Sequence, residues 1–279
     1  MKPQAKKQEI VKKPDVDITT LATSEAPDYL AEYASEQAEG FEEVRPSDVK
    51  VPRIAVAQAM TPQLNEDDAK FISTLKRGHF FNTATGEDYG ETILFVPLLK
   101  FGNRILFEDI DKGGGLLCRS NDMKQGEGDP GGECAKCEYA RFGTARGGKG
   151  KGTACNEFYN FPVLIVRDGK INADSIAVLS MKSSHIEAAQ KLLGLAMNRR
   201  LNGSRAPMWS GVYSATSKLK KFTAGSSHVI VIDNAGWISK ENTKIAHDSY
   251  QFMHELREQG RLTTDQEVDE PGASDESNS

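Results

Sequence analysis

Residues 156–181 read NEFYNFPVLIVRDGKINADSIAVLSM, and the fold class follows from this segment. Its two halves are rich in Phe, Tyr, Val and Ile, the residue types that pack best on a pleated sheet. Between them, residues 167–170 (RDGK) have the chemistry of a tight turn. The segment therefore predicts two strands joined by a turn and indicates a β-rich domain.

Further strand patterns lie on both sides of this segment. Towards the N-terminus, VPRIAVAQAM (51–60) reads as a strand. Residues 78–110 read as a run of short β segments, with a hairpin at FFNTATGEDY and Gly86 in its turn. The pair Gly102-Asn103 is expected to divide the last two of these strands. Towards the C-terminus, residues 209–239 predict two or three more strands.

Two stretches have the periodicity of helices. Residues 183–203 begin with a serine cap, and a single helix face would carry Ile186, Ala189, Leu192, Leu193 and Ala196. Residues 241–262 show a second amphipathic pattern. Together with the strands, these helices predict a β-rich α+β fold.

The distribution of charge divides the chain into three parts. The net charge is −5, but residues 1–48 hold 6 Lys/Arg and 11 Asp/Glu, and residues 263–279 hold 6 acids and no base. Residues 49–262 therefore carry 29 bases and 23 acids, a balance of +6. We expect a disordered N-terminal arm, a basic folded core and an acidic disordered tail. The basic core removes the objection that an acidic protein would not bind nucleic acid.

The composition also indicates where in the cell the protein is expected. A mean hydropathy of −0.50 and the lack of an apolar run of about 20 residues argue against a membrane span. The basic start has no apolar region behind it and so does not resemble a secretory signal. We therefore expect a cytoplasmic protein, in which four cysteines are unsuited to structural disulfides.

All four cysteines fall in the glycine- and charge-rich segment 111–157, at Cys118, Cys134, Cys137 and Cys155. This segment is too long for an unsupported loop and lacks the apolar residues of a core. The C-x2-C pair presents two thiolates to one tetrahedral metal, and the outer two cysteines could close the site. We expect one structural zinc ion in an inserted zinc-ribbon-like subdomain. A redox-active C-x2-C motif and unrelated cysteines remain alternatives.

Basic and aromatic residues are interleaved in the core, as single-stranded DNA binding requires. Residues 182–222 hold eight bases against the single acid Glu187. Aromatic residues in strands are more often core, so we expect Phe95 and Phe107 inside and at most one of Phe158 and Tyr159 on the surface. The residues expected to contact DNA are Lys100, Phe101, Arg104, Tyr139, Arg141, Phe142, Arg146, Lys149, Lys151, Tyr159, Arg199, Arg200, Trp209, Tyr213, Lys218, Lys220, Lys221 and Phe222.

Catalytic motifs are missing from the sequence. The five histidines form no HExxH pair, the glycine-rich runs do not match a P-loop, and no G-x-S-x-G elbow occurs. We therefore expect a protein that is not an enzyme.

In this organisation the chain resembles phage-encoded single-stranded-DNA-binding proteins of replication, of the T7 and T4 types. The shared features are a basic, aromatic β-rich core and a negative tail, here Asp265, Glu267, Asp269, Glu270, Asp275 and Glu276. The blocks VPRIAVAQAMTPQL and FFNTATGEDYGETILFVPL are also similar to those of tailed-phage proteins with this role. The T4-type protein binds zinc through one histidine and three cysteines, whereas this chain offers four cysteines.

The resemblance implies an OB-like β-barrel with flanking helices, which binds single strands without strong sequence preference. It also implies that the tail recruits replication or recombination proteins and competes with DNA for the basic groove; a merely solubilising tail is the alternative. Two other functions stay open. One is a virion or assembly protein whose zinc knuckle binds a protein, and the other is a zinc-containing nuclease or recombination enzyme.

Overall fold

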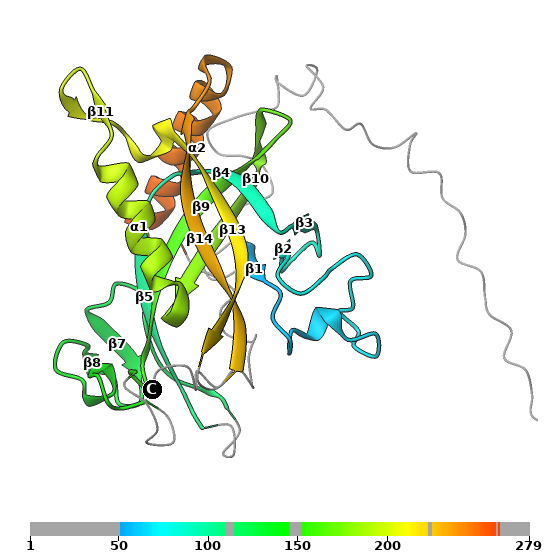
Figure 1. The fold of residues 1–279 in the computed structure, drawn as a ribbon. Helices are drawn as coiled ribbons and strands as arrows, with labels where there is room; N and C mark the ends of the chain where they lie inside the picture. Colours follow the sequence, from blue (N-terminus) through cyan, green and yellow to red (C-terminus); the bar gives the residue numbers. More distant parts are fainter. Residues whose placement is uncertain (1–50, 110–113, 146–151, 223–224, 261, 263–279) are drawn as a thin grey trace, which may run out of the picture. The chain divides into compact units, whose positions relative to one another are not determined.

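The computed structural model describes residues 51–109, 114–145, 152–222, 225–260 and 262. All of them lie in the second of two compact units, Arg45–Ser279. Within this unit the strands are β1 (Arg53–Val56), β2 (Phe80–Asn82), β3 (Asp88–Gly90), β4 (Thr92–Pro97), β5 (Phe101–Phe107), β6 (Leu116–Ser120), β7 (Gln125–Gly128), β8 (Gly132–Glu133), β9 (Asn156–Arg167), β10 (Lys170–Lys182), β11 (Arg200–Leu201), β12 (Ser204–Arg205), β13 (Gly211–Phe222) and β14 (Gly225–Trp237). The α-helices are α1 (Ile186–Met197) and α2 (Lys240–Glu258), and short 3-10 turns are Pro62–Leu64, Glu138–Ala140, Ser183–His185 and Met208–Ser210. The β-rich α+β class is thus confirmed (Figure 1).

The hairpin expected at residues 156–181 is the centre of the sheet. Strands β9 and β10 pair antiparallel, with Lys170 opposite Arg167 and Asp168-Gly169 as the two turn residues. Both turn residues have positive φ, 49° and 75°, as a tight hairpin turn with the right-handed twist requires. On its other edge, β9 pairs with β5 through its first half and with β4 through its second half.

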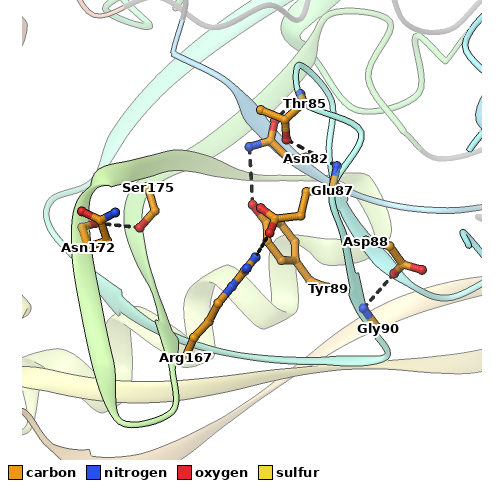
Figure 2. Close-up of polar contacts among 9 residues, drawn as sticks. All are labelled: Asn82, Thr85, Glu87, Asp88, Tyr89, Gly90, Arg167, Asn172 and Ser175. Atoms are coloured by element: carbon orange, nitrogen blue, oxygen red, sulfur yellow. Dashed lines mark hydrogen bonds and ion pairs between the residues drawn. The ribbon is translucent and has the colours of Figure 1, made fainter. Parts of the chain in front are cut away.

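The β9–β10 turn also contacts the β2–β3 hairpin, whose turn contains Gly86 as expected. The guanidinium of Arg167 forms an ion pair with Glu87 and lies 5.1 Å from the ring centroid of Tyr89 (Figure 2). The Tyr89 hydroxyl in turn accepts a 3.4 Å hydrogen bond from the Asn82 amide. These contacts join two hairpins that are distant in the sequence.

The side chains of β9 alternate between two hydrophobic clusters because successive residues of a strand point to opposite faces. Phe161, Val163 and Ile165 pack in one cluster with Ala189 and Leu192 of α1. Leu164 packs in the other cluster with Ala246 and Met253 of α2. One helix therefore covers each face of the central sheet, and the expected buried face of α1 is confirmed.

The strands do not form the closed barrel that an OB-like fold implies. Twelve strands form one sheet with a branch at β9, and among the described residues no ring of paired strands closes. Instead, the path β1–β10–β9–β4–β13–β14 has its two ends joined by one side chain. The amide of Gln58, just after β1, donates to the carbonyl of His228 in β14 and accepts from its N–H, both at 2.9 Å.

The Gln58 side chain therefore takes the place of a ladder between β1 and β14. Its removal should have a measurable effect on the stability of the protein. We expect Gln58→Ala to lower the free energy of unfolding by about 1–2 kcal/mol, because a partly buried strand edge loses its partner. Urea unfolding measures the loss, and hydrogen exchange should show faster exchange of the His228 amide. Gln58→Glu keeps the acceptor for the His228 N–H and should lose less stability than Gln58→Ala. Equal stability of the wild type and both variants would contradict this role.

The structure also corrects one expected turn. Gly102-Asn103 does not divide two strands but lies inside β5, where Gly102 pairs with Tyr159 and Asn103 with Phe158. The connection from β4 runs instead through Leu98 and Leu99, whose side chains are buried. Asn103 is buried and accepts a 2.6 Å hydrogen bond from the Asn160 amide, which satisfies its polar side chain inside the sheet.

Candidate metal centre and nucleic-acid interface

The four cysteines are carried by elements that β5 and β9 hold in place. Cys118 lies in β6, opposite Leu106 of β5 on one side and Gly128 of β7 on the other. Cys155 directly precedes β9, and its N–H donates to the carbonyl of Tyr139 at 2.8 Å. Cys118 is therefore held inside a sheet strand, and Cys155 directly before one.

The inner pair forms a tight turn between these two. The N–H of Cys134 donates to the carbonyl of Lys124 at 2.8 Å, and the N–H of Cys137 donates back to the carbonyl of Cys134 at 3.3 Å. The 3-10 turn Glu138–Ala140 follows and leads to the contact with Cys155. This backbone arrangement brings a C-x2-C pair beside the ends of two strands.

All four cysteines line one cavity of about 10 Å³, room for about one water-sized sphere. Gly126 makes space for it, because a Cβ at this position would lie 2.9 Å from the Sγ of Cys118. Burial raises the pKa of the Cys155 thiol to about 11 against the opposing effect of Arg104, and Cys137, Cys134 and Cys118 add to the rise. The other three cysteines are thus close enough to Cys155 to affect the pKa of its thiol.

The chemistry of this donor set fits zinc. Four thiols match the ligands of closed, structural zinc sites. Among the described residues, no three or more Cys, His, Asp or Glu side chains already stand at coordinating spacing.

The basic residues expected to bind DNA are most concentrated at the end of the β13–β14 hairpin. Lys218, Lys220 and Lys221 are exposed, and the Nζ of Lys220 lies 5.4 Å from the ring centroid of the half-buried Phe222. No acid occurs between Gly211 and Ile232. Within the described part of the chain, none of the three lysines forms an ion pair. We call residues 218–222 the lysine tip.

The cysteine segment adds exposed rings. Phe142 is 86% exposed and Tyr139 is 37% exposed, and Arg141 between them is also exposed. The bases Arg146, Lys149 and Lys151, which we also expect to contact DNA, lie outside the described residues.

Other residues that we expect to contact DNA form ion pairs or ring contacts within the protein. The guanidinium of Arg104 forms a 2.8 Å ion pair with Glu157. The Nζ of Lys100 lies 4.7 Å from the ring centroid of Tyr159. Partial burial lowers the pKa of Lys100, and burial raises the pKa of Tyr159. Lys100, Arg104 and Tyr159 therefore belong to a partly buried polar group beside the start of β9 and do not form an open cationic surface.

Two expected stacking rings are buried in the structure, and a third is partly buried. Phe101 is buried because β5 continues through Gly102, and Tyr213 is fully buried against Phe95, with their ring centroids 6.1 Å apart. Trp209 packs on the α2 cluster, and its ring meets His247 edge-on at 5.5 Å. The expected burial of Phe95 is confirmed, whereas Phe107 is only half-buried. Phe158 is buried and Tyr159 is half-buried, which agrees with the expectation that at most one of the two reaches the surface.

The remaining arginines lie at the other end of β13. Arg199 lies 5.0 Å from the ring centroid of Tyr213 and 4.5 Å from that of Trp237, and Arg200 is exposed. Arg199 lies against residues 211–213 of β13, so five or more residues of strand, roughly 17 Å, separate it from the lysine tip. The expected DNA contacts in and next to β13 therefore form two groups and not one channel. Sequence reasoning missed Trp237, although this ring is 50% exposed.

Several expectations concern residues that the structure does not describe. The N-terminal arm (1–48) and the acidic tail (263–279) lie outside the described residues, so their expected disorder and the role of the tail stay predictions. No helix in the described ranges is both long and apolar enough to cross a membrane.

Comparison with known proteins gives the family of the chain. Residues 19–259 match the family model described as Pam3 phage gp34-like protein. The comparisons with curated proteins and with solved structures found no match. The family match covers most of the chain and confirms the phage origin expected from the sequence. The chain belongs to the Pam3 phage gp34-like protein family.

Proposed function

We propose that this phage protein binds single-stranded DNA without strong sequence preference and serves DNA replication, recombination or repair. The observation that carries the proposal is the lysine tip, where three exposed lysines adjoin a phenylalanine ring in a stretch, residues 211–232, that holds no acid. Cations bind the phosphates of a strand, and exposed rings stack on its bases. Binding of this kind needs no base-specific contacts.

The other parts of the molecule support the same function. Phe142 and Tyr139 offer further exposed rings on the cysteine segment. One zinc ion held by Cys118, Cys134, Cys137 and Cys155 would order this segment, because its binding free energy becomes folding free energy. The Gln58 side chain holds the end of β1 against β14, the strand that follows the lysine tip, although no ladder joins these two strands.

The proposal extends to location and partners. The protein would act in the host cytoplasm as a non-enzymatic component, as T7-type and T4-type proteins do. The acidic tail, Asp265 to Glu276, would contact replication or recombination proteins and compete with DNA for the lysines.

A binding titration tests the proposal. Fluorescently labelled oligo(dT) and a duplex of equal length are titrated with the full chain at about 50 mM and about 200 mM salt. We expect tighter binding of the single strand, with an affinity that falls steeply as salt rises. Equal or weaker binding of the single strand, or no binding at low salt, would contradict the proposal, and no binding would favour a protein-interaction role. Strand cleavage with a divalent metal would point to the enzyme alternative.

A further inference from the structure

At the end of β13 and β14 opposite the lysine tip, an arginine lies against an exposed aromatic ring. Trp237, the last residue of β14, is 50% exposed. The Arg199 guanidinium lies between its ring and that of Tyr213, 4.5 Å and 5.0 Å from the two centroids. An exposed indole with a cation held against its ring is a feature of sites that bind planar ligands.

The backbone is shaped to hold this arginine. The Nη2 of Arg199 donates to the Oδ1 of Asn234 and to the carbonyl of Gly236, where the β13–β14 register shifts by a bulge. Bulges redirect side chains, often near functional sites. Opposite Trp237 stands Gly211, at which a Cβ would lie 2.7 Å from the Tyr213 hydroxyl and 2.9 Å from the Cζ of Arg199. The position needs glycine to leave room for the guanidinium.

The charge around this cluster is positive and incompletely balanced. Arg200 and Arg205 stand directly opposite each other in β11 and β12, a pairing that destabilises a hairpin unless an anion is bound. No acid occurs between Glu187 and Asp233, and Asp233 is held by Lys191 in a 2.8 Å ion pair. The Nη1 of Arg199 is buried and has no hydrogen-bond partner among the described residues.

We propose that this end of the hairpin is a second nucleotide subsite, in which Trp237 stacks on a base and Arg200 and Arg205 bind the adjoining phosphates. The proposal rests on single-stranded DNA binding as the function. A planar base and an anionic backbone match an exposed indole beside paired arginines, whereas an apolar protein partner would leave the arginine pair unbalanced. The subsite is separate from the lysine tip, so each can be tested without the other.

Tryptophan fluorescence provides the first test, since the chain has two tryptophans and Trp209 is packed against α2. In a Trp209→Phe variant, the remaining signal comes from Trp237. We expect oligo(dT) of about 16 nucleotides to quench it strongly at saturation, since stacked bases quench indole emission. Inorganic polyphosphate of similar charge should leave the emission unchanged, and equal quenching by polyphosphate would overturn the stacking platform.

Affinity variants provide the second test. Trp237→Ala should weaken oligo(dT) binding about tenfold, as expected for the loss of one stacked base, and Trp237→Phe should restore most of the affinity. Phe252→Ala is the matched control, because this ring on α2 is 53% exposed and should not matter. If Trp237→Ala leaves the affinity unchanged, and oligo(dT) does not quench the emission of the Trp209→Phe variant, the subsite alone is overturned, provided that lysine-tip variants still lose binding. Absence of all oligo(dT) binding overturns the proposed function as well.

Discussion

Replacement of Lys218, Lys220 and Lys221 together by glutamine is expected to weaken oligo(dT) binding about 100-fold at 0.1 M salt. Each phosphate contact to a single strand contributes about 0.7 to the slope of log K against log salt, so three contacts contribute about 2. The slope of the variant should be less steep by that amount. Fluorescence anisotropy over a range of salt concentrations measures both quantities.

The chain offers a control with the same change in charge. Lys170, Lys240 and Lys244 are also exposed, but they lie at the β9–β10 turn and at the start of α2. Their replacement by glutamine should change the affinity and the slope little. If both triple variants lose affinity equally, DNA responds to the net charge of the protein and the lysine tip is not a site.

Removal of the metal is expected to have the largest effect on stability. We expect about one zinc ion per purified chain, and Cys134→Ser should abolish it, because a structural site with three thiols binds far more weakly than one with four. The free energy of zinc binding, about 10–16 kcal/mol in small zinc domains, is largely folding free energy. The cysteine segment should therefore lose its hydrogen-exchange protection in the variant and after chelation. Elemental analysis and hydrogen exchange measure the two effects.

Ala135→Ser is the control for this experiment. It adds one hydroxyl at an exposed position between Cys134 and Cys137 and should keep both the zinc and the protection of the segment. Wild-type protein that is purified without metal and unaffected by a chelator would contradict the zinc proposal.

The central hairpin could be predicted because its signals are local. The Asp168-Gly169 turn and the β-branched runs on either side determine the β9–β10 pairing without help from distant residues. The cysteines could be placed together because all four fall in one glycine- and charge-rich segment that lacks the apolar residues of a core. Their common cavity agrees with that reasoning.

The errors arise where tertiary contacts override a local signal. Gly102-Asn103 has the composition of a turn, but Asn160 satisfies the Asn103 side chain, and Gly102 leaves room for Met123, whose Sδ would lie 2.1 Å from a Cβ. Phe101 is therefore carried into the core. Tyr213 alternates with half-buried neighbours in β13, and only the packing of β4 and α1 determines which face is fully buried.

One missed element did carry a usable signal. The sequence predicts that the first helix continues to residue 202, but α1 ends at Met197 and residues 200–205 form the β11–β12 hairpin. Asn202 and Gly203 both have positive φ, 48° and 82°, which an Asn-Gly turn favours. Trp237 carried no such signal, because its importance depends on Arg199, which is distant in the sequence.

The most direct measurement of the central claim is photo-crosslinking of the full chain to oligo(dT) that contains 5-iododeoxyuridine, followed by mass spectrometric mapping. Binding of single-stranded DNA at the end of the β13–β14 hairpin predicts cross-links within residues 218–222, above all at Phe222, and their loss as salt rises. Cross-links confined to α2, for example at the exposed Phe252, or the absence of cross-links at low salt, would contradict it.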